Sequence, residues 1–220
     1  MISLSGTVPL PTAVRGTLKV SLRVATGELK VLLGANGCGK STVLDTIAGA
    51  RFPLRDVIRS QGPYGYAVQD AATGLLPWLT VRENVGAPVQ LRAQTGVSIE
   101  EPACPDADWL LAELAIAHLS DRLPHRLSGG ERQLVNIARA LHTPGCRLLL
   151  DEPFANLGRA SRERACRILA RVRYHCAILL VTHLPEDLEV LPTGAYVIRA
   201  GVCEDVDLPS ARDFMGGGRP

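Results

Sequence analysis

The segment from residue 34 to residue 41 constrains the fold more than any other part of the sequence. It reads Gly-Ala-Asn-Gly-Cys-Gly-Lys-Ser, follows the apolar run 29–33 and precedes residues 41–50, whose apolar positions have helical spacing. This is the phosphate-binding pattern G-x-x-x-x-G-K-[S/T], and it stands between a strand and a helix, where its mechanism requires it. We therefore expect an α/β chain that binds a nucleoside triphosphate at this turn.

Each residue type in this turn has a chemical use. Glycines let backbone N–H groups wrap around phosphates, the helix N-terminus adds its positive dipole, Lys40 neutralises phosphate charge and Ser41 can ligate Mg²⁺. A ligand-free glycine turn would not explain why one of only three lysines stands here. The predicted nucleotide contacts are Gly34, Ala35, Asn36, Gly37, Cys38, Gly39, Lys40, Ser41 and Thr42.

The segment 147–152 narrows the range of possible protein classes. The phosphate-binding turn alone is compatible with kinases, GTPases and motor ATPases. An apolar strand ends there in two adjacent carboxylates, Asp151 and Glu152. At the carboxyl edge of a sheet, Asp151 can reach Mg²⁺ while Glu152 orients or deprotonates a water molecule. We predict a metal ligand at Asp151 and a catalytic base at Glu152.

Residues 127–133, Leu-Ser-Gly-Gly-Glu-Arg-Gln, form a second candidate phosphate cradle. Ser128, Gly129 and Gly130 begin a predicted helix, and a helix N-terminus of this composition binds anions. One nucleotide has a single γ-phosphate. Two cradles in one chain therefore imply that two chains share each site.

With these motifs in this order, the chain resembles the ATP-binding cassette (ABC) family along nearly its whole length. A glutamine loop at Gln69 and a switch histidine at His183 complete the resemblance. It implies ATP hydrolysis with Mg²⁺ in a head-to-tail dimer that sandwiches two ATP molecules. It also implies that Gln69 contacts Mg²⁺ or the attacking water, and that His183 takes part in catalysis.

The fold class expected is α/β, a P-loop NTPase core with a mostly parallel sheet. The resemblance adds a small antiparallel β subdomain and a helical signature subdomain over roughly 75–135. We expect one ATP-binding domain over 1–205 and a flexible tail over 206–220. The hydrophobic patterns predict strands at 17–24, 29–33, 66–68, 147–150, 177–182 and 195–199, and helices at 41–50, 106–119, 128–141 and 159–174.

Composition and hydropathy argue against a nucleic-acid-binding, membrane-spanning or secreted protein. The chain has 220 residues, 46% of them apolar, and 24 Lys+Arg against 22 Asp+Glu, which fits a single core and gives no field that would attract nucleic acid. No apolar run approaches the roughly 20 residues of a membrane span, residues 1–10 do not read as a secretory signal, and the six cysteines are scattered. We expect a chain on the cytoplasmic face of the cell membrane, bound there through a partner.

The function implied by the resemblance is the ATPase subunit of a small-solute importer. Residues 75–85 look most like ATPases of nitrate, sulfonate and taurine importers, and lie where such proteins receive the permease's coupling helix. The implied partners are membrane permease subunits, a second ATPase subunit, either identical or different, and an extracytoplasmic solute-binding protein. An exporter ATPase subunit and a soluble cassette ATPase not tied to transport remain alternatives.

Three positions depart from the family pattern or add to it. No aromatic residue precedes Phe52, so we expect adenine to lie on aliphatic groups around residues 12–14. Gly158 stands where an aspartate is usual, which leaves the coupling between the two sites open. Cys38 lies within the phosphate loop, where N–H groups and the helix dipole are expected to favour its reactive thiolate. The alternative is a small buried side chain that only fills space.

Overall fold

The structure is a computed structural model that describes residues 1–11, 16–50, 57–94, 105–183, 188 and 192–216. Its strands are β1 (Ile2–Pro9), β2 (Thr17–Val24), β3 (Leu29–Gly34), β4 (Val57–Arg59), β5 (Gly65–Ala67), β6 (Arg147–Asp151), β7 (Ala177–Val181), β8 (Gly194–Arg199) and β9 (Val202–Val206). Its helices are α1 (Lys40–Ala48), α2 (Ala71–Gly74), α3 (Val81–Gln94), α4 (Ala107–Glu113), α5 (Gly129–Leu141), α6 (Arg159–Val172) and α8 (Leu208–Met215), with 3₁₀ turns η1 (Ala117–Leu119) and η2 (Pro124–Arg126).

The nine strands form one sheet in the order β4-β1-β2-β9-β8-β3-β7-β6-β5. The strands β8, β3, β7, β6 and β5 run parallel, as the short apolar runs predicted. Asp151 is in register with Val181 on β7, and Gly34 with Ile198 on β8. The carboxyl ends of these strands therefore lie along one edge of the sheet, where α/β folds bind ligands.

The core has two sides because successive strand residues point to opposite faces. On β6, Leu148 and Leu150 belong to one apolar cluster and Leu149 to the other, and all three are at most 1% exposed. The first cluster includes buried residues of α5 and α6, and the second includes those of α1. Burial of each leucine contributes about 1.5–3 kcal/mol. The predicted α/β fold with helices on both faces is confirmed.

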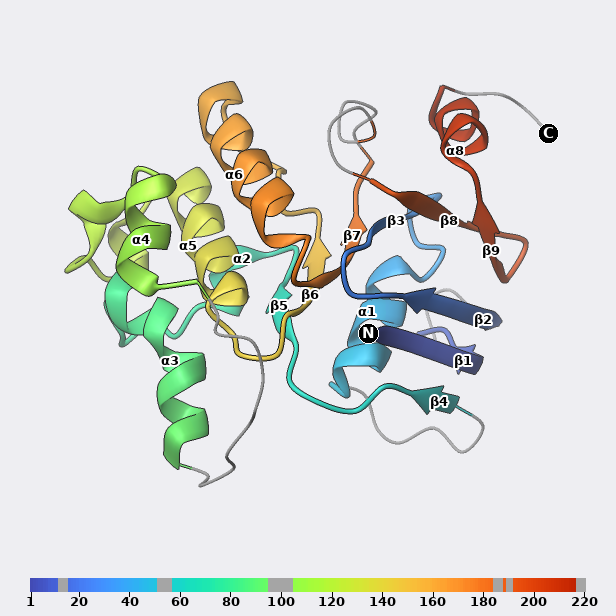
Figure 1. Cartoon of the computed structure of the whole chain (residues 1–220), viewed down its shortest axis with the longest axis horizontal. Helices are drawn as coiled ribbons and strands as arrows, with labels where there is room; N and C mark the ends of the chain where they lie inside the picture. The colour runs from blue at the N-terminus through green and yellow to red at the C-terminus, as the bar shows by residue number, and fades with distance from the viewer. Residues whose placement is uncertain (12–15, 51–56, 95–104, 184–187, 189–191, 217–220) are drawn as a thin grey trace.

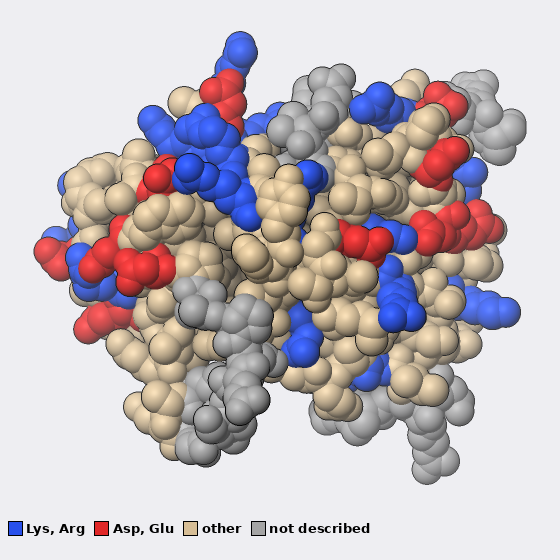
Figure 2. Space-filling view, viewed as in Figure 1, with Lys and Arg blue, Asp and Glu red and all other residues tan. Residues whose placement is uncertain are grey.

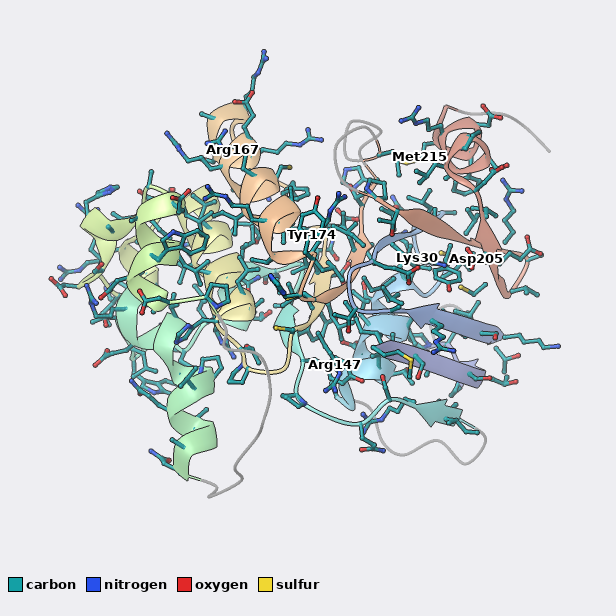
Figure 3. The ribbon with its side chains drawn as sticks, in the orientation of Figure 1. Lys30, Arg147, Arg167, Tyr174, Asp205 and Met215 are labelled. Carbon is teal, nitrogen blue, oxygen red and sulfur yellow. The ribbon has the colours of Figure 1, made fainter. Side chains whose placement is uncertain are left out.

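The antiparallel part of the sheet lies beside α1 (Figure 1). The predicted half-exposed strand is β2, whose residues alternate between exposed and buried along its whole length. The sequence did not predict β1, which pairs with β2 along all eight residues, or β4, which pairs with β1 through three. At the boundary with the parallel strands, Lys30 on β3 forms a 2.9 Å ion pair with Asp205 on β9, and Figure 3 shows the two side chains next to each other.

The predicted helix over 106–119 is wrong in its second half. Helix α4 ends at Glu113, because Ala115 adopts a left-handed conformation with φ of 58°. The N–H groups of Ala115 and Ile116 donate to carbonyls of Ala112 and Leu111, which is the Schellman pattern of helix termination. The apolar positions stay buried nevertheless, so hydrophobic spacing alone could not reveal the break.

The expected flexible tail over 206–220 also differs from the structure, which has helix α8 over Leu208–Met215. Asp207 caps this helix by accepting a hydrogen bond from the Ser210 N–H, and Ala211 is completely buried. A single buried alanine gives almost no signal in the sequence. Residues 217–220 lie outside the described part of the chain.

The predicted arginine-rich helix is α6, and its charged side chains face solvent. Arg159 is 93% exposed in its ion pair with Glu163, and Figure 3 shows Arg167 extending away from the ribbon. Basic side chains gather over this helix in Figure 2. The charge run forms a solvated helix face. Among the described residues, no helix is both long and apolar enough to cross a bilayer.

Candidate functional site

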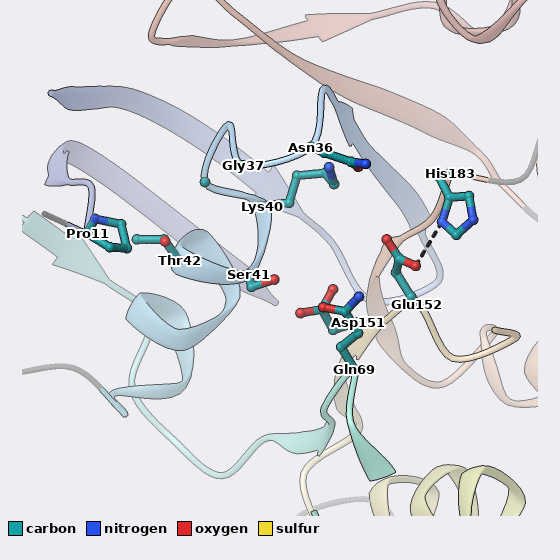
Figure 4. A pocket seen from close by; sticks show the side chains of 11 residues that line it. Pro11, Asn36, Gly37, Lys40, Ser41, Thr42, Gln69, Asp151, Glu152 and His183 are labelled. Carbon is teal, nitrogen blue, oxygen red and sulfur yellow. Dashed lines mark ion pairs between the residues drawn. The ribbon is translucent and has the colours of Figure 1, made fainter. Parts of the chain in front are cut away.

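A cavity of about 570 Å³ lies at the carboxyl edge of the parallel strands (Figure 4). It contains most of the residues that the sequence singled out, from five separate segments of the chain. Its lining residues are Pro11, Asn36, Gly37, Gly39, Lys40, Ser41, Thr42, Gln69, Asp151, Glu152 and His183. The sheet topology thus brings the phosphate loop, both carboxylates, the glutamine and the histidine together.

The phosphate loop connects β3 to α1 and depends on its glycines. Gly37 and Gly39 have φ of 77° and 107°, a region that residues with a Cβ atom rarely adopt. Lys40 begins α1, is 8% exposed and donates from Nζ to the carbonyls of Gly34 and Ala35 at 2.8 and 3.0 Å. The ammonium group is therefore held inside the curve of the loop, where it can meet phosphate oxygens.

Asp151 ends β6 and is 3% exposed. Its burial raises the pKa of the carboxyl group, and a hydrogen bond from the Ser41 side chain acts in the opposite direction. A buried carboxylate beside a hydroxyl and the amide of Gln69 is an oxygen-rich set, which is what Mg²⁺ prefers in proteins. These three side chains fit a magnesium ion.

Glu152 lies directly after β6 in an unusual backbone conformation, with φ of 48°. Its N–H donates to the carbonyl of Val181 on the neighbouring strand. Its Oε2 atom lies 2.8 Å from Nδ1 of His183, and Figure 4 shows this pair at the rim of the cavity. The Glu152 side chain is 12% exposed and that of His183 56% exposed. The pair can accept and pass on a proton at a position that water reaches.

The second predicted cradle, Ser128 to Gly130, is not part of this cavity. Ser128 and Gly129 are exposed, and no atom lies within 4 Å of a Cβ added at Gly129. The Ser128 side chain and Glu131 form a reciprocal capping box at the start of α5. Within one chain, this segment caps a helix and lines no part of the phosphate cavity.

The expectation for Cys38 is wrong. Cys38 lines a second cavity of about 1100 Å³ behind the phosphate loop, together with Ile198 and Phe214. Its Sγ atom lies 2.5 Å from where a Cβ at Gly34 would stand, so the thiol packs on the loop's own backbone. Burial raises the pKa of the Cys38 thiol, and Lys40 only partly opposes this. The reactive thiolate is disfavoured.

The predicted adenine contacts around residues 12–14 lie outside the described residues. Pro11, which the sequence analysis did not select, lines the cavity next to them. Gly158, which stands where the family usually has an aspartate, is the N-cap residue of α6 and makes no side-chain hydrogen bond to the helix. A Cβ added at Gly158 would meet no atom within 4 Å, so space does not exclude an aspartate there.

The fold and site define a P-loop nucleoside triphosphatase whose phosphate loop, acidic strand end, glutamine and histidine share one cavity. The family model for ABC transporters matches residues 18–155. The chain belongs to the ABC transporter family, and it is an ATP-binding and ATP-hydrolysing subunit of that family.

Relatives agree with this assignment, and a solved structure shares the fold. The chain is 36% identical over 190 residues to the taurine import ATP-binding protein TauB of Chromobacterium violaceum, covering 83% of this chain and 71% of the relative. It is 36% identical over 200 residues to the aliphatic sulfonates import ATP-binding protein SsuB 1 of Streptomyces avermitilis, covering 89% and 73%. A dimeric bacterial ABC transporter cassette matches with a TM-score of 0.77 at 22% identity, covering 94% of this chain and 99% of that one.

Proposed function

We propose that this chain powers the import of a small sulfur-containing anion, of the sulfonate or sulfate class, through a separate membrane permease. The observation that carries this proposal is the agreement among relatives. Those with 33–39% identity include import ATP-binding proteins for taurine, aliphatic sulfonates and sulfate or thiosulfate. An extracytoplasmic solute-binding protein would deliver the solute, and the chain would sit peripherally at the cytoplasmic face of the membrane.

We propose the following roles within the cavity. Lys40 and the loop backbone bind the β- and γ-phosphates, while Ser41, Gln69 and Asp151 hold Mg²⁺, which supplies charge neutralisation on those phosphates. Glu152 orients and deprotonates the attacking water, and His183 steadies Glu152 through the 2.8 Å contact. The shared location of these groups supports the roles.

The permease would dock on a groove beside α3. This groove has a volume of about 180 Å³ and a mainly apolar lining that includes Tyr64, Leu76, Pro88 and Leu91, beside Arg139 and Thr143. Leu91 is 59% exposed, and Trp78 on the loop before α3 is 70% exposed. Exposed apolar side chains at a groove favour a helix of a partner protein. Residues 75–85, which resemble the importer ATPases, lead into the same helix.

Deletion of the gene in its source organism tests the transport proposal. The deletion strain is expected to lose growth on taurine or an alkanesulfonate as sole sulfur source, and to keep growth on cysteine. Wild-type protein restores growth, whereas Glu152→Gln does not. Unchanged growth on every sulfonate and on sulfate would contradict the proposed solute class and leave an exporter or a soluble ATPase as the alternative.

Docking is tested separately by Leu91→Glu. This substitution is expected to reduce co-purification with the permease while ATP binding stays unchanged, because the groove lies apart from the phosphate cavity. Ile58→Glu is the matched control, since Ile58 is 78% exposed on β4 and does not line this groove. Equal loss of the permease with both variants would argue against docking at α3.

A further inference from the structure

Helix α5 carries two buried amide side chains on one face. Gln133 is 4% exposed and Asn136 is 1% exposed, and their spacing of three residues places them next to each other. Most other buried residues of this helix are apolar. Burying an amide costs free energy unless its hydrogen bonds are made, so these two positions need a reason.

Gln133 binds the turn that carries Glu152. Its Nε2 atom donates to the carbonyl of Pro153 at 3.1 Å and lies 3.5 Å from the carbonyl of Glu152. Glu152 has a left-handed backbone conformation, which is unfavourable for a residue with a side chain and persists only where surrounding contacts hold it. Gln133 supplies such a contact from a separate helix.

Asn136 makes an equivalent hydrogen bond to the segment that carries Gln69. Its Nδ2 atom donates to the carbonyl of Val68 at 2.8 Å, directly before Gln69. Its Oδ1 atom is buried and has no hydrogen-bond partner among the described residues. The two amides are alike in chemistry and burial but hold different segments, which makes Asn136 a control for Gln133.

We propose that Gln133 is a positioning residue for Glu152. It does not line the cavity, and it acts by fixing the backbone from which the Glu152 carboxylate reaches His183. Because Gln133 and Ser128 belong to the start of the same helix, a movement of α5 would shift the carboxylate together with the second cradle, Ser128 to Gly130. The proposal rests on the proposed role of Glu152.

The first test separates turnover from binding. Gln133→Met keeps an unbranched side chain of similar length but removes the donor. We expect kcat for ATP to fall about tenfold, within the range that a displaced catalytic group loses, with the Kd for ATP unchanged. Asn136→Leu is the matched loss of a buried amide. A parallel loss of ATP binding in Gln133→Met would overturn the proposal, and so would wild-type kcat.

The second test asks whether Gln133 acts through Glu152. In single-turnover hydrolysis with excess protein, Gln133→Met is expected to cause no further loss in a Glu152→Gln background, whereas Asn136→Leu lowers the rate by the same factor in both backgrounds. If Gln133→Met lowered the rate by the same factor in the wild-type and the Glu152→Gln backgrounds, the proposal would be overturned. Wild-type turnover by Glu152→Gln alone would instead refute the role of Glu152.

A second variant covers the case in which Gln133→Met does not fold. Gln133→Glu keeps the shape of the side chain but turns an oxygen toward two carbonyl oxygens, and it is expected to show the same loss of kcat. Circular dichroism and thermal melting report folding for each variant. If neither variant folds, the amide serves the fold itself and the proposal is overturned.

Discussion

The two phosphate-binding segments of the molecule differ in how complete they are. Residues 36, 37 and 39–42 of the phosphate loop share one cavity with both carboxylates, Gln69 and His183, and the loop's lysine is almost buried. In the segment 128–130, Ser128 and Gly129 are exposed, none of the three residues lines that cavity, and the serine caps a helix. The phosphate loop is surrounded by the other candidate catalytic side chains, while the segment 128–130 presents a helix N-terminus to solvent.

This difference indicates how the chain works. A phosphate cradle open to solvent is useful only if another molecule brings the phosphate. We infer that the exposed segment closes the nucleotide site of a second chain, and that hydrolysis needs both.

Glu152→Gln should remove chemistry without removing binding. The amide keeps the shape of the side chain and leaves Asp151 in place, but it cannot accept a proton from water. We expect kcat to fall by about 10²–10⁴-fold, the range typical for loss of a general base, while ATP affinity is retained. Steady-state phosphate release and equilibrium ATP binding measure the two quantities. Turnover at the wild-type rate would show that another group activates the water.

Lys40→Ala should remove binding itself. A hydrogen bond to a charged group contributes about 1.5–3 kcal/mol, so ATP affinity is expected to fall roughly 10- to 100-fold. Titration with a fluorescent ATP analogue gives the Kd. Lys19→Ala, on the exposed side of β2, is the control and should bind normally. Equal binding by both variants would mean that the loop holds no phosphate.

Asp151→Asn should stabilise the nucleotide-free chain while abolishing hydrolysis. Burial raises the folded-state pKa of Asp151, so its stabilising contribution is present below the unfolded pKa and lost as pH rises through the folded pKa. The uncharged amide of Asp151→Asn avoids this loss of stability near neutral pH. Tm should therefore rise by about 2–4 °C for each kcal/mol gained in the free energy of unfolding.

The control for this prediction is Asp207→Asn, which should have the opposite sign. Hydrogen bonds from Ser210 lower the pKa of Asp207, so its contribution is present above the unfolded pKa and lost as pH falls. Melting curves between acid and neutral pH check both variants. A Tm of Asp151→Asn below that of wild type at neutral pH would contradict the assigned cost of the buried charge.

Gly158→Asp should have the smallest effect on stability. The site has room for the side chain, and an aspartate there would cap α6, which gains a few tenths of a kcal/mol over glycine. Urea unfolding measures this gain. A larger change in ATPase activity than in stability would show that this position influences the site of the partner chain.

Much of the cavity could be predicted because its signals are local. The loop 34–41 and the carboxylates 151–152 follow short apolar strands, and such strands are buried in a parallel sheet wherever they occur. The strands β1 and β4 could not be predicted, because β4 has three residues and exists through its pairing with β1.

The errors came from contacts between distant segments. The direction of Cys38 depends on Ile198 and Phe214, which lie more than 150 residues further along the chain. The role of Gln133 could not be predicted from the segment 127–133, since its partner is the Pro153 carbonyl, 20 residues further along the chain. A polar residue on the apolar face of α5 was the available signal. The roles assigned to the site residues stay predictions.

The most direct test of the central claim is the mass of the ATP-bound complex. In light scattering, Glu152→Gln with ATP should have the mass of a dimer that contains two ATP molecules. Without nucleotide it should have the mass of a monomer. Adding Ser128→Arg, which fills the exposed segment with a long side chain, should abolish the dimer and leave ATP binding through Lys40 intact. A normal ATP-driven dimer with Ser128→Arg, or full hydrolysis by a monomer, would contradict the claim that a second chain completes the site.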